Sequence, residues 1–396
     1  MRRLLPLVAV LVAVDTMLYA ALTPLLPHFA HEFGLSKSRA GVLVAAYAGG
    51  ALTGGLPGGL AAVRLGARRA VLVGLTGMGL ASVGFALADS FGTLVAARFV
   101  QGAGSAFTWA GAFAWLLAAA PRERRGQLLG TAMGAAIFGA LFGPVIGAAA
   151  ALGGRAPVFA GLAVLALVLA VWTLRLEDAP PGERPSVAAL ARAFRTPLFR
   201  GGLGLMALPS LLFGVLSVLA PLHLAAAGWG AAAIGAVWLA SAGLESVQAP
   251  LIGRIADARG RRLPVAVTLA ASTALSLLLA LGARPLFYVP LVVLASISYG
   301  VLFTPAFALI ADGAERAGLA QGMAFGFMNA AWAVGAVVGP AAGGALARAS
   351  GDWMPFVLAG AASLVAFVAA TRYSGDERAA VLVDRLPRDA ASVARE

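Results

Sequence analysis

Apolar residues recur along this chain in windows of about 20 positions, separated by short polar stretches. A helix of that length crosses ~30 Å of hydrocarbon. The windows are dominated by Ala, Gly and Leu and lack a period-two alternation, so we predict helices rather than barrel strands. We expect twelve transmembrane spans, at residues 4–26, 40–63, 70–88, 92–118, 127–151, 157–174, 201–225, 231–252, 263–282, 286–310, 319–347 and 354–371.

Composition agrees with this pattern. Hydrophobic residues make up 61% of 396 positions, charged residues only 12%, and the mean hydropathy is +0.91. A soluble domain of ordinary composition is far less apolar. The chain is therefore predicted to be an all-α integral membrane protein that lies in a lipid bilayer.

Cysteine is absent, which excludes disulfides and thiolate metal sites. His28 and His31 are one helical turn apart, but they fall where we expect an exposed loop, so we predict no metal site. The pattern calls for no cofactor either.

The distribution of basic residues predicts the orientation in the membrane. With a cytoplasmic N-terminus, 23 basic residues fall on the cytoplasmic side, five on the outer side, and Arg98 lies within a span. The positive-inside rule then places both termini in the cytoplasm and explains the net charge of +12 without nucleic acid. The use of 28 arginines and one lysine suggests a GC-rich genome, and hence a bacterial cytoplasmic membrane. We expect a monomer.

The two parts of the chain repeat each other. The segment 139–147, GALFGPVIG, matches 335–344, GAVVGPAAGG, so that Pro144 and Pro340 are 196 residues apart. We therefore predict two six-helix halves, 1–174 and 201–371, joined by a cytoplasmic linker, 175–200, and followed by a cytoplasmic tail, 372–396. Because each half has an even number of spans, both enter the membrane in the same orientation and can rock about a site at the midplane.

These motifs resemble the major facilitator superfamily, and within it the twelve-span drug:proton antiporters. LVAARFVQGAGSA (94–106) is similar to the fourth-helix signature L-x-x-x-R-x-x-Q-G-x-G-x-A, and 139–147 resembles the antiporter signature of the fifth helix. The loop signature G-x-x-x-D-R-x-G-R-R is matched around Asp257, Arg261 and Arg262, whereas its first copy has Val63 where the acid is usual. The first helix is similar to that of vesicular amine transporters, in which an acid can engage a cationic substrate.

Charged residues within the spans are the main candidates for chemistry. A charge at the bilayer centre costs about 2.5 kcal/mol or more, so its presence needs an explanation. Asp15 lies about eleven residues from the end of its span, or ~16 Å deep. The difference in depth between Asp15 and Arg98 can be spanned by an arginine side chain plus a water molecule, and Gln101 shares the face of Arg98. We predict that Asp15, Arg98, Gln101 and Glu245 couple protons to substrate. The alternatives are a structural ion pair between Asp15 and Arg98 and a structural role for Glu245 beside the basic loop.

Other residues are candidates for the cavity and its gates. The substrate cavity is predicted to include Tyr19, Trp109, Tyr299, Phe303 and Asn329. Small residues let helices approach closely in lipid, and proline kinks them. The predicted gating residues are therefore Gly139, Gly143, Pro144, Gly147, Gly339 and Pro340, together with a charge cluster of Asp257, Arg261 and Arg262. Ordinary small-residue packing is the alternative.

These observations predict a secondary active transporter that exports small lipophilic or cationic compounds in exchange for protons by alternating access. Uptake or facilitated diffusion of a small metabolite is the alternative within transport. An enzyme is disfavoured because no nucleophile and base, metal cluster or phosphate loop is apparent. A membrane sensor is a more distant alternative, since no accessory domain is evident.

Overall fold

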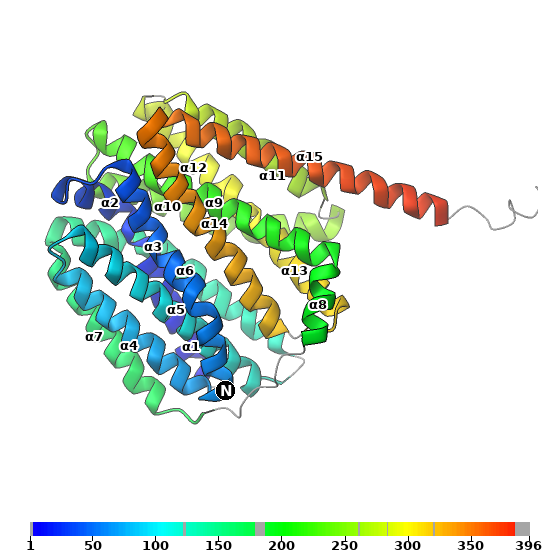
Figure 1. Ribbon diagram of the computed structural model, residues 1–396, viewed down its shortest axis with the longest axis horizontal. Helices are drawn as coiled ribbons and strands as arrows, with labels where there is room; N and C mark the ends of the chain where they lie inside the picture. The colour runs from blue at the N-terminus through cyan, green and yellow to red at the C-terminus, as the bar shows by residue number, and fades with distance from the viewer. Residues whose placement is uncertain are drawn as a thin grey trace, which may run out of the picture.

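The computed structural model describes residues 3–121, 124–178, 187–259, 262–282, 284–319 and 321–384, and all the regular elements in these ranges are helices (Figure 1). They are α1 (Leu4–Ala20), α2 (Leu22–Glu32), α3 (Lys37–Arg64), α4 (Ala67–Ala86), α5 (Phe91–Ala119), α6 (Arg125–Gly153), α7 (Arg155–Leu174), α8 (Val187–Arg195), α9 (Pro197–Ala226), α10 (Ala231–Arg259), α11 (Arg262–Ala280), α12 (Pro285–Val301), α13 (Phe303–Arg316), α14 (Gln321–Ser350) and α15 (Trp353–Asp384).

The predicted apolar windows coincide with these helices. Ten helical segments of the described residues are long and apolar enough to cross a membrane, which confirms an all-helical, multi-pass bundle. The windows 92–118 and 231–252 lie on α5 and α10, which are helices of 29 residues each but are not among these ten. The count of twelve spans therefore stays a prediction.

Two of the predicted spans are each broken into two helices. α1 and α2 are separated at Ala21, and α12 and α13 are separated at Leu302. Each break is followed by a proline, Pro24 or Pro305. Proline has no N–H to donate and its ring clashes with the carbonyl four residues earlier. The regular hydrogen-bond ladder is thus interrupted at these two points, and backbone carbonyls become available to other donors.

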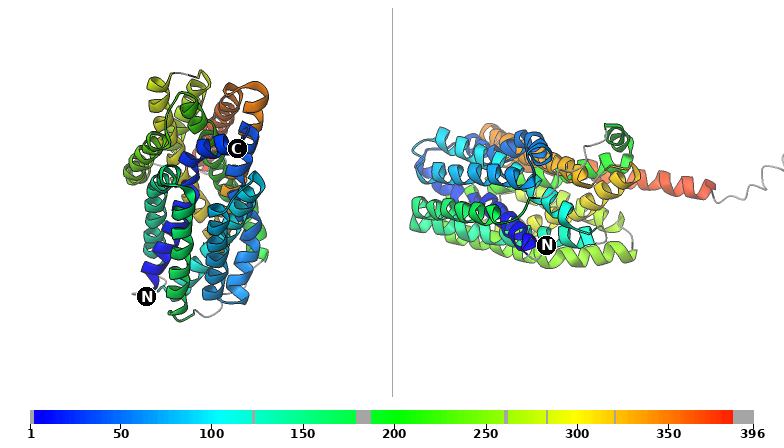
Figure 2. Two further views of the ribbon diagram at one scale, coloured as in Figure 1. Left: turned by 90° about the vertical axis from the view of Figure 1, so that its left-hand side faces the viewer. Right: turned by 90° about the horizontal axis from the view of Figure 1, so that it is seen from below.

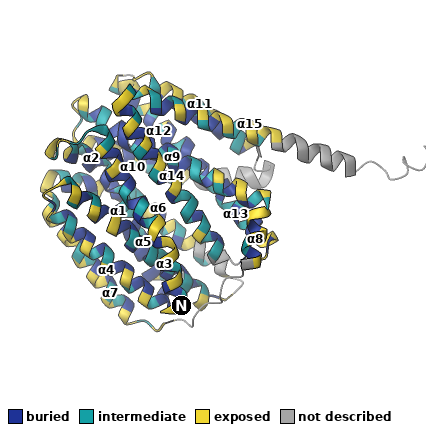
Figure 3. Cartoon of the chain, viewed as in Figure 1, coloured by how far each residue is buried: buried dark blue, intermediate teal, exposed yellow. Residues whose placement is uncertain are grey.

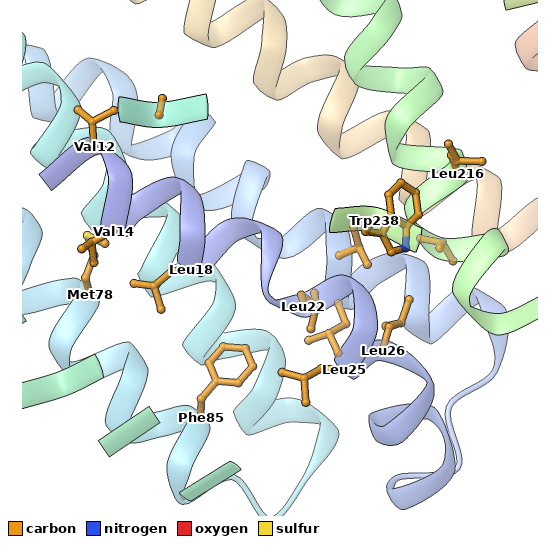
Figure 4. Close-up of a cluster of buried hydrophobic side chains, with 14 of the residues drawn as sticks. Val12, Val14, Leu18, Leu22, Leu25, Leu26, Met78, Phe85, Leu216 and Trp238 are labelled. Atoms are coloured by element: carbon orange, nitrogen blue, oxygen red, sulfur yellow. The ribbon is translucent and has the colours of Figure 1, made fainter. Parts of the chain in front are cut away.

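The long helices run along one common direction (Figure 2). The N-terminal end of the bundle is the end where α1 begins, and the opposite end is the one where α2 ends and α3 begins. The surface carries many exposed apolar side chains, including Leu80, Val164 and Val365 at 60% exposure or more, as a lipid-facing surface requires (Figure 3). Inside, the labelled side chains of α1 and α2 lie between Met78 and Phe85 of α4 and Leu216 and Trp238 of α9 and α10 (Figure 4).

The glycine stripe of α6 packs directly on α1. A Cβ added at Gly139 would meet the carbonyl oxygen of Ala13, and one added at Gly147 would meet that of Ala21. Thr16 Oγ1 also donates a hydrogen bond of 2.9 Å to the carbonyl of Ala136 on α6. The same type of contact recurs 196 residues later, where glycines of α14 meet carbonyl oxygens of α9: Gly335 with Ala207 and Gly339 with Leu211. The repeated motif therefore makes the same backbone contact twice, while the boundaries of the two halves stay a prediction.

α3 and α14 come from different predicted halves and lie side by side (Figure 1). Near the opposite end of the bundle their backbones touch, because a Cβ at Gly41 would meet the carbonyl of Pro340 and one at Gly344 would meet that of Lys37. Closer to the N-terminal end, an added Cβ at Gly55 of α3 or Gly326 of α14 would have nothing within 4 Å. The close contact of these two helices is thus at the opposite end.

The predicted linker is attached to both neighbouring parts of the bundle. Trp115 Nε1 donates to the carbonyl of Glu177 at 3.1 Å, and the backbone N–H of Arg68 donates to Asp178 Oδ1 at 3.0 Å. Asp178 thereby brings a carboxylate to the first turn of α4, where the helix dipole favours a negative charge. This turn lies close in the chain to Val63, near the end of α3, which replaces the acid of the signature. Further along, α8 was not predicted, and its Arg192 Nε donates to the carbonyl of Ala317 at 3.2 Å.

Candidate functional site between the helices

Asp15 lies buried at 2% exposure, with one of its oxygens surrounded by donors. Its Oδ2 accepts hydrogen bonds from Trp109 Nε1 at 2.6 Å, from the Ser105 hydroxyl at 2.9 Å and from the Tyr47 hydroxyl at 3.0 Å. The hydroxyls of Tyr47 and Ser105 are also 2.8 Å apart. Hydrogen bonds to a charged acceptor are among the stronger ones in proteins. Asp15 Oδ1, in contrast, is buried and has no hydrogen-bond partner.

Arg98 is equally buried, but it binds backbone carbonyls instead of Asp15. Its Nη1 donates to the carbonyl of Leu18 at 3.0 Å and its Nη2 donates to that of Tyr19 at 2.6 Å, just before the break between α1 and α2. Nη1 also donates to Gln101 Oε1 at 2.6 Å. Within the described part of the chain, Arg98 and Asp15 form no ion pair. Both residues nevertheless belong to one group of side chains around α1, in which each contacts Tyr47.

Tyr47 connects the two charged groups. Its ring lies 4.8 Å from the Arg98 guanidinium carbon, within the range of a cation–π interaction, while its hydroxyl donates to Asp15. Sequence reasoning missed Tyr47 and Ser105. For Ser105 a signal was present, since Arg98, Gln101, Ser105 and Trp109 follow one another at steps of three or four residues and therefore share one face of α5. Tyr47 lies on α3, and no spacing in the sequence relates it to α5.

Aromatic side chains from α14 meet this cluster across the bundle. Tyr19 lies 5.0 Å from Tyr47 and 5.4 Å from Trp332, measured between ring centroids. Phe113, one turn beyond Trp109, stacks on Phe325 at 5.7 Å. Because Phe325 and Trp332 are seven residues apart, both lie on one face of α14. Asn329 lies between them on that same face, so this predicted cavity residue faces the helices that carry Asp15 and Trp109.

The other two predicted cavity residues belong to a different group of side chains. Tyr299 and Phe303 both contact the ring of Phe213 on α9, at 5.8 and 6.2 Å. Tyr299 is 1% exposed, and its hydroxyl lies 2.8 Å from the Ser276 hydroxyl. The structure therefore joins Trp109 to Asp15, places Tyr19 against Tyr47 beside it, and puts Asn329 on the face of α14 that meets this cluster, whereas it places Tyr299 and Phe303 with Phe213.

Glu245 is separate from the Asp15 cluster. It lies on α10 against Gly300 of α12, where a Cβ added at Gly300 would meet its carboxyl group. A small pocket beside it is lined by Ile137, Ser246, Gly300 and Val301. Glu245 thus faces the junction of α6, α10 and α12.

The structure describes the contacts of the predicted gating glycines, but not the side chains of the predicted charge cluster. Gly139, Gly143 and Gly147 contact α1 and α2, while Gly339 contacts α9 and the carbonyl of Pro340 faces Gly41 on α3. Pro144 lies within α6. The side chains of Asp257 and Arg262, and the whole of Arg261, lie outside the described residues.

Among the residues that the structure describes, no group of three acidic, histidine or cysteine side chains is arranged to hold a metal ion. The side chain of His28 lies 3.5 Å from that of Glu32.

Comparison with known proteins identifies the family whose model this chain matches and a solved structure of similar fold. The model of the family described as Major Facilitator Superfamily matches residues 8–324. A solved structure, the crystal structure of a D-xylose-proton symporter, superposes with a TM-score of 0.72 at 16% sequence identity and covers 92% of this chain and 96% of that chain. The search of curated proteins finds no match. At this identity the structural likeness concerns the fold alone.

Proposed function

The chain belongs to the major facilitator superfamily, and from that premise we propose that it is a proton-coupled secondary transporter of small lipophilic cations. Members of this family are membrane transporters of small molecules, not enzymes. The proposal adds three finer points: coupling to protons, a cationic substrate, and export across a bacterial cytoplasmic membrane with both termini in the cytoplasm. We propose a monomer as the working unit.

The free oxygen of Asp15 is the observation that supports a cationic substrate. Three donors hold Oδ2 in place, and Oδ1 is left with no partner. A buried carboxylate oxygen without a partner is costly, so a ligand that supplies a positive charge or a donor gains by binding there. Arg98 is committed to the carbonyls of Leu18 and Tyr19 and does not neutralise this oxygen.

The surrounding side chains support a lipophilic ligand. The rings of Tyr19, Trp109, Phe113, Phe325 and Trp332 line the contacts between α1, α5 and α14. Aromatic faces attract cations and bury large apolar area. The amides near this region include Asn329 and Gln101. Gln101 Oε1 accepts a hydrogen bond from Arg98, while Gln101 Nε2 and Arg98 Nε have no hydrogen-bond partner among the described residues. Five aromatic rings gather at these contacts and a carboxylate oxygen is free, so we propose a lipophilic cation in preference to a sugar-like ligand.

Transport into proteoliposomes under an imposed pH gradient tests this proposal, with tetraphenylphosphonium as the probe. We expect the probe to accumulate in the acidic compartment, because proton flow toward the alkaline side would drive the cation the other way. Accumulation on the alkaline side would instead favour symport, the uptake alternative, which the D-xylose-proton symporter performs on the same fold. Movement that ignores the pH gradient would contradict proton coupling.

Asp15→Asn is the matching variant. It keeps the shape of the side chain but cannot ionise, so we expect loss of probe binding and of accumulation. Asp89→Asn is the control, since Asp89 is an exposed carboxylate that contacts Thr93 at the opposite end. Binding of the probe by a folded Asp15→Asn protein at the wild-type level would contradict a role for this carboxylate in holding the cation.

A further inference from the structure

Glu245 is a second carboxylate within a predicted span; it is half-buried on α10, and its surroundings differ from those of Asp15. The described structure gives it neither a hydrogen bond nor an ion pair, and the pocket beside it is lined by residues of α6, α10 and α12. Gly300 leaves room for its carboxyl group, because any Cβ at that position would collide with it. A carboxylate that fits against a bare backbone, without donors, needs another reason to be there.

Among the described residues, no side chain of the helices packed against α10 forms an ion pair with Glu245. Their titratable or charged side chains are His28, His31 and Glu32 of α2, Arg125 of α6, Arg200 and His223 of α9, Arg262 of α11, and Tyr288 and Tyr299 of α12. Tyr299 is closest in the chain to Gly300, but its hydroxyl lies against Ser276. Glu32 pairs with Arg155 at the opposite end. The side chains of Arg125 and Arg262 lie outside the described residues, at the N-terminal end of their helices.

The break between α12 and α13 provides acceptors instead of donors. Gly300 and Val301 are the last residues of α12, and the C-terminal end of a helix carries a partial negative charge. Pro305 lacks the N–H that would otherwise reach the carbonyl of Val301. Carbonyl oxygens accept a hydrogen bond from a protonated carboxyl group, whereas they repel a carboxylate. The site thus suits a carboxyl group that gains and loses a proton.

We propose that Glu245 binds and releases the coupled proton, while Asp15 holds the positive charge of the substrate. This inference rests on the proposed function and divides its two tasks between two carboxylates. Asp15 accepts from three fixed donors at one oxygen, and its other oxygen has no hydrogen-bond partner and is left for a ligand that supplies a positive charge. Glu245 has no such donors among the described residues. The pocket that Glu245 lines is also lined by Ile137 of α6, from the other predicted half, so Glu245 lies where the two predicted halves meet.

The first test is chemical labelling, which needs no substrate. N,N′-Dicyclohexylcarbodiimide, a membrane-soluble reagent, adds to a protonated carboxyl group: the carboxyl oxygen bonds to the central carbon and the proton moves to a nitrogen. The adduct rearranges to a stable N-acylurea with no leaving group. Peptide mass spectrometry of the full chain should find the adduct on Glu245, increasing as the pH is lowered, and none on Asp15. Labelling of Asp15 with an unlabelled Glu245 would overturn the assignment.

The second test separates coupling from binding. In proteoliposomes, Glu245→Gln should lose accumulation of tetraphenylphosphonium driven by the pH gradient but keep exchange of labelled for unlabelled probe, whereas Asp15→Asn should lose both. Gly300→Ala should weaken the gradient response, because its Cβ displaces the Glu245 carboxyl, and Gly204→Ala is the control, since its Cβ meets nothing within 4 Å.

The outcomes distinguish this inference from the proposed function. Coupled accumulation by a folded Glu245→Gln protein overturns the inference alone. A wild-type protein that ignores the gradient overturns the proposed function, while the labelling result still decides whether Glu245 takes up a proton. If Glu245→Gln does not fold, Glu245→Asp keeps a carboxyl group and should retain coupling with a shifted pH profile. A complete loss of coupling in folded Glu245→Asp with unlabelled Glu245 in the wild type would count against the proposal.

Discussion

At the scale of single residues, the surroundings of Arg98 explain why a second charge is buried beside Asp15. The guanidinium donates to the carbonyls of Leu18 and Tyr19 and lies over the ring of Tyr47. Those carbonyls precede the α1–α2 break, where the helical ladder is interrupted and donors are scarce. Arg98 therefore joins α5 to the break in α1–α2 through the backbone, and Tyr47 lies between the cation and Asp15.

This arrangement gives different predictions for the two charges. Arg98→Ala should lower the free energy of unfolding by about 1–3 kcal/mol, because the two carbonyls and Gln101 Oε1 lose their donor. The double variant Asp15→Asn/Arg98→Ala should not regain this stability, since Asp15 and Arg98 do not pair directly. Thermal unfolding of the purified protein in detergent measures both variants.

A structural ion pair predicts the opposite result for the double variant. Removing both members of a buried pair restores much of the stability that is lost when only one is removed. A double variant as stable as the wild type, with unchanged coupled transport, would show that the charges serve only each other.

At the scale of elements, α1 is held by α6 through backbone contact. The glycines at 139, 143 and 147 bring α6 against Ala13 and Met17 of α1, the helix that carries Asp15, and against Ala21 at the α1–α2 break. Such close approach is the usual way in which helices associate in lipid, where apolar surface alone provides no driving force. The contact of this stripe is with the neighbouring α1 and α2, so it sets the position of Asp15 within its own half. A role in sealing the cavity remains a proposal.

We expect Gly143→Leu to disturb transport through this contact. An added side chain at Gly143 would meet the carbonyl of Met17 at 2.8 Å and the methyl of Ala20, so α1 must shift or α6 must move away. Overpacking of this kind costs about 1–3 kcal/mol. Gly134→Leu on the same helix is the control, because its Cβ has nothing within 4 Å. Membrane insertion, measured by yield in the membrane fraction, and transport of the probe should separate the two variants.

At the scale of the whole molecule, the two predicted halves contact each other at the end of the bundle where α2 ends and α3 begins. Lys37 Nζ of α3 lies 2.5 Å from Oδ1 of Asp352, the residue just before α15. Beside this ion pair, Gly41 of α3 and Gly344 of α14 make the backbone contacts between the two helices. The structure therefore represents a state in which this end is closed. In alternating access this ion pair must break when the end opens.

Charge reversal at Lys37 and Asp352 tests whether this ion pair keeps the end of the bundle closed. Lys37→Asp should separate α3 from α14 at this end of the bundle. A cysteine introduced at Ala347 of α14, which is 4% exposed, should then react faster with a thiol reagent. Combining it with Asp352→Lys should restore slow labelling, because the pair is re-formed with opposite polarity. The effect on stability should be about 1 kcal/mol or less, as for other partly exposed pairs. Unchanged labelling in the single variant would show that the glycine contact alone closes this end.

The orientation of the molecule has its own test. Cysteines at Ser36 and Gly153, at the opposite end, should react with an impermeant thiol reagent added to intact cells, whereas cysteines at Ala67 and Ser186 should not. The reason is the excess of basic residues predicted on the cytoplasmic side. The chain has no cysteine of its own, so each variant reports a single position. Reversed labelling would contradict the predicted placement of both termini.

The sequence alone determined the helical membrane fold and the family. Hydrocarbon requires long apolar segments with internally bonded backbones, so the windows are visible without knowing any contact. It also singled out Asp15, Arg98 and Glu245, because a charge in an apolar window is conspicuous wherever its partners lie. The 196-residue repeat likewise pointed to glycine contacts that the structure shows on both α6 and α14.

Only the tertiary structure decided which groups these charges meet. Tyr47 is 32 residues from Asp15 and Trp109 is 94 residues away, yet both donate to the same oxygen. Arg98 was within reach of Asp15 by depth, but it binds carbonyls that the α1–α2 break exposes. Asp178 reaches Arg68 from 110 residues away, in a loop that lacks its own acid. Hydropathy fixes the depth of a residue in the membrane, whereas the rotation of each helix about its axis, which selects partners, depends on packing against all its neighbours.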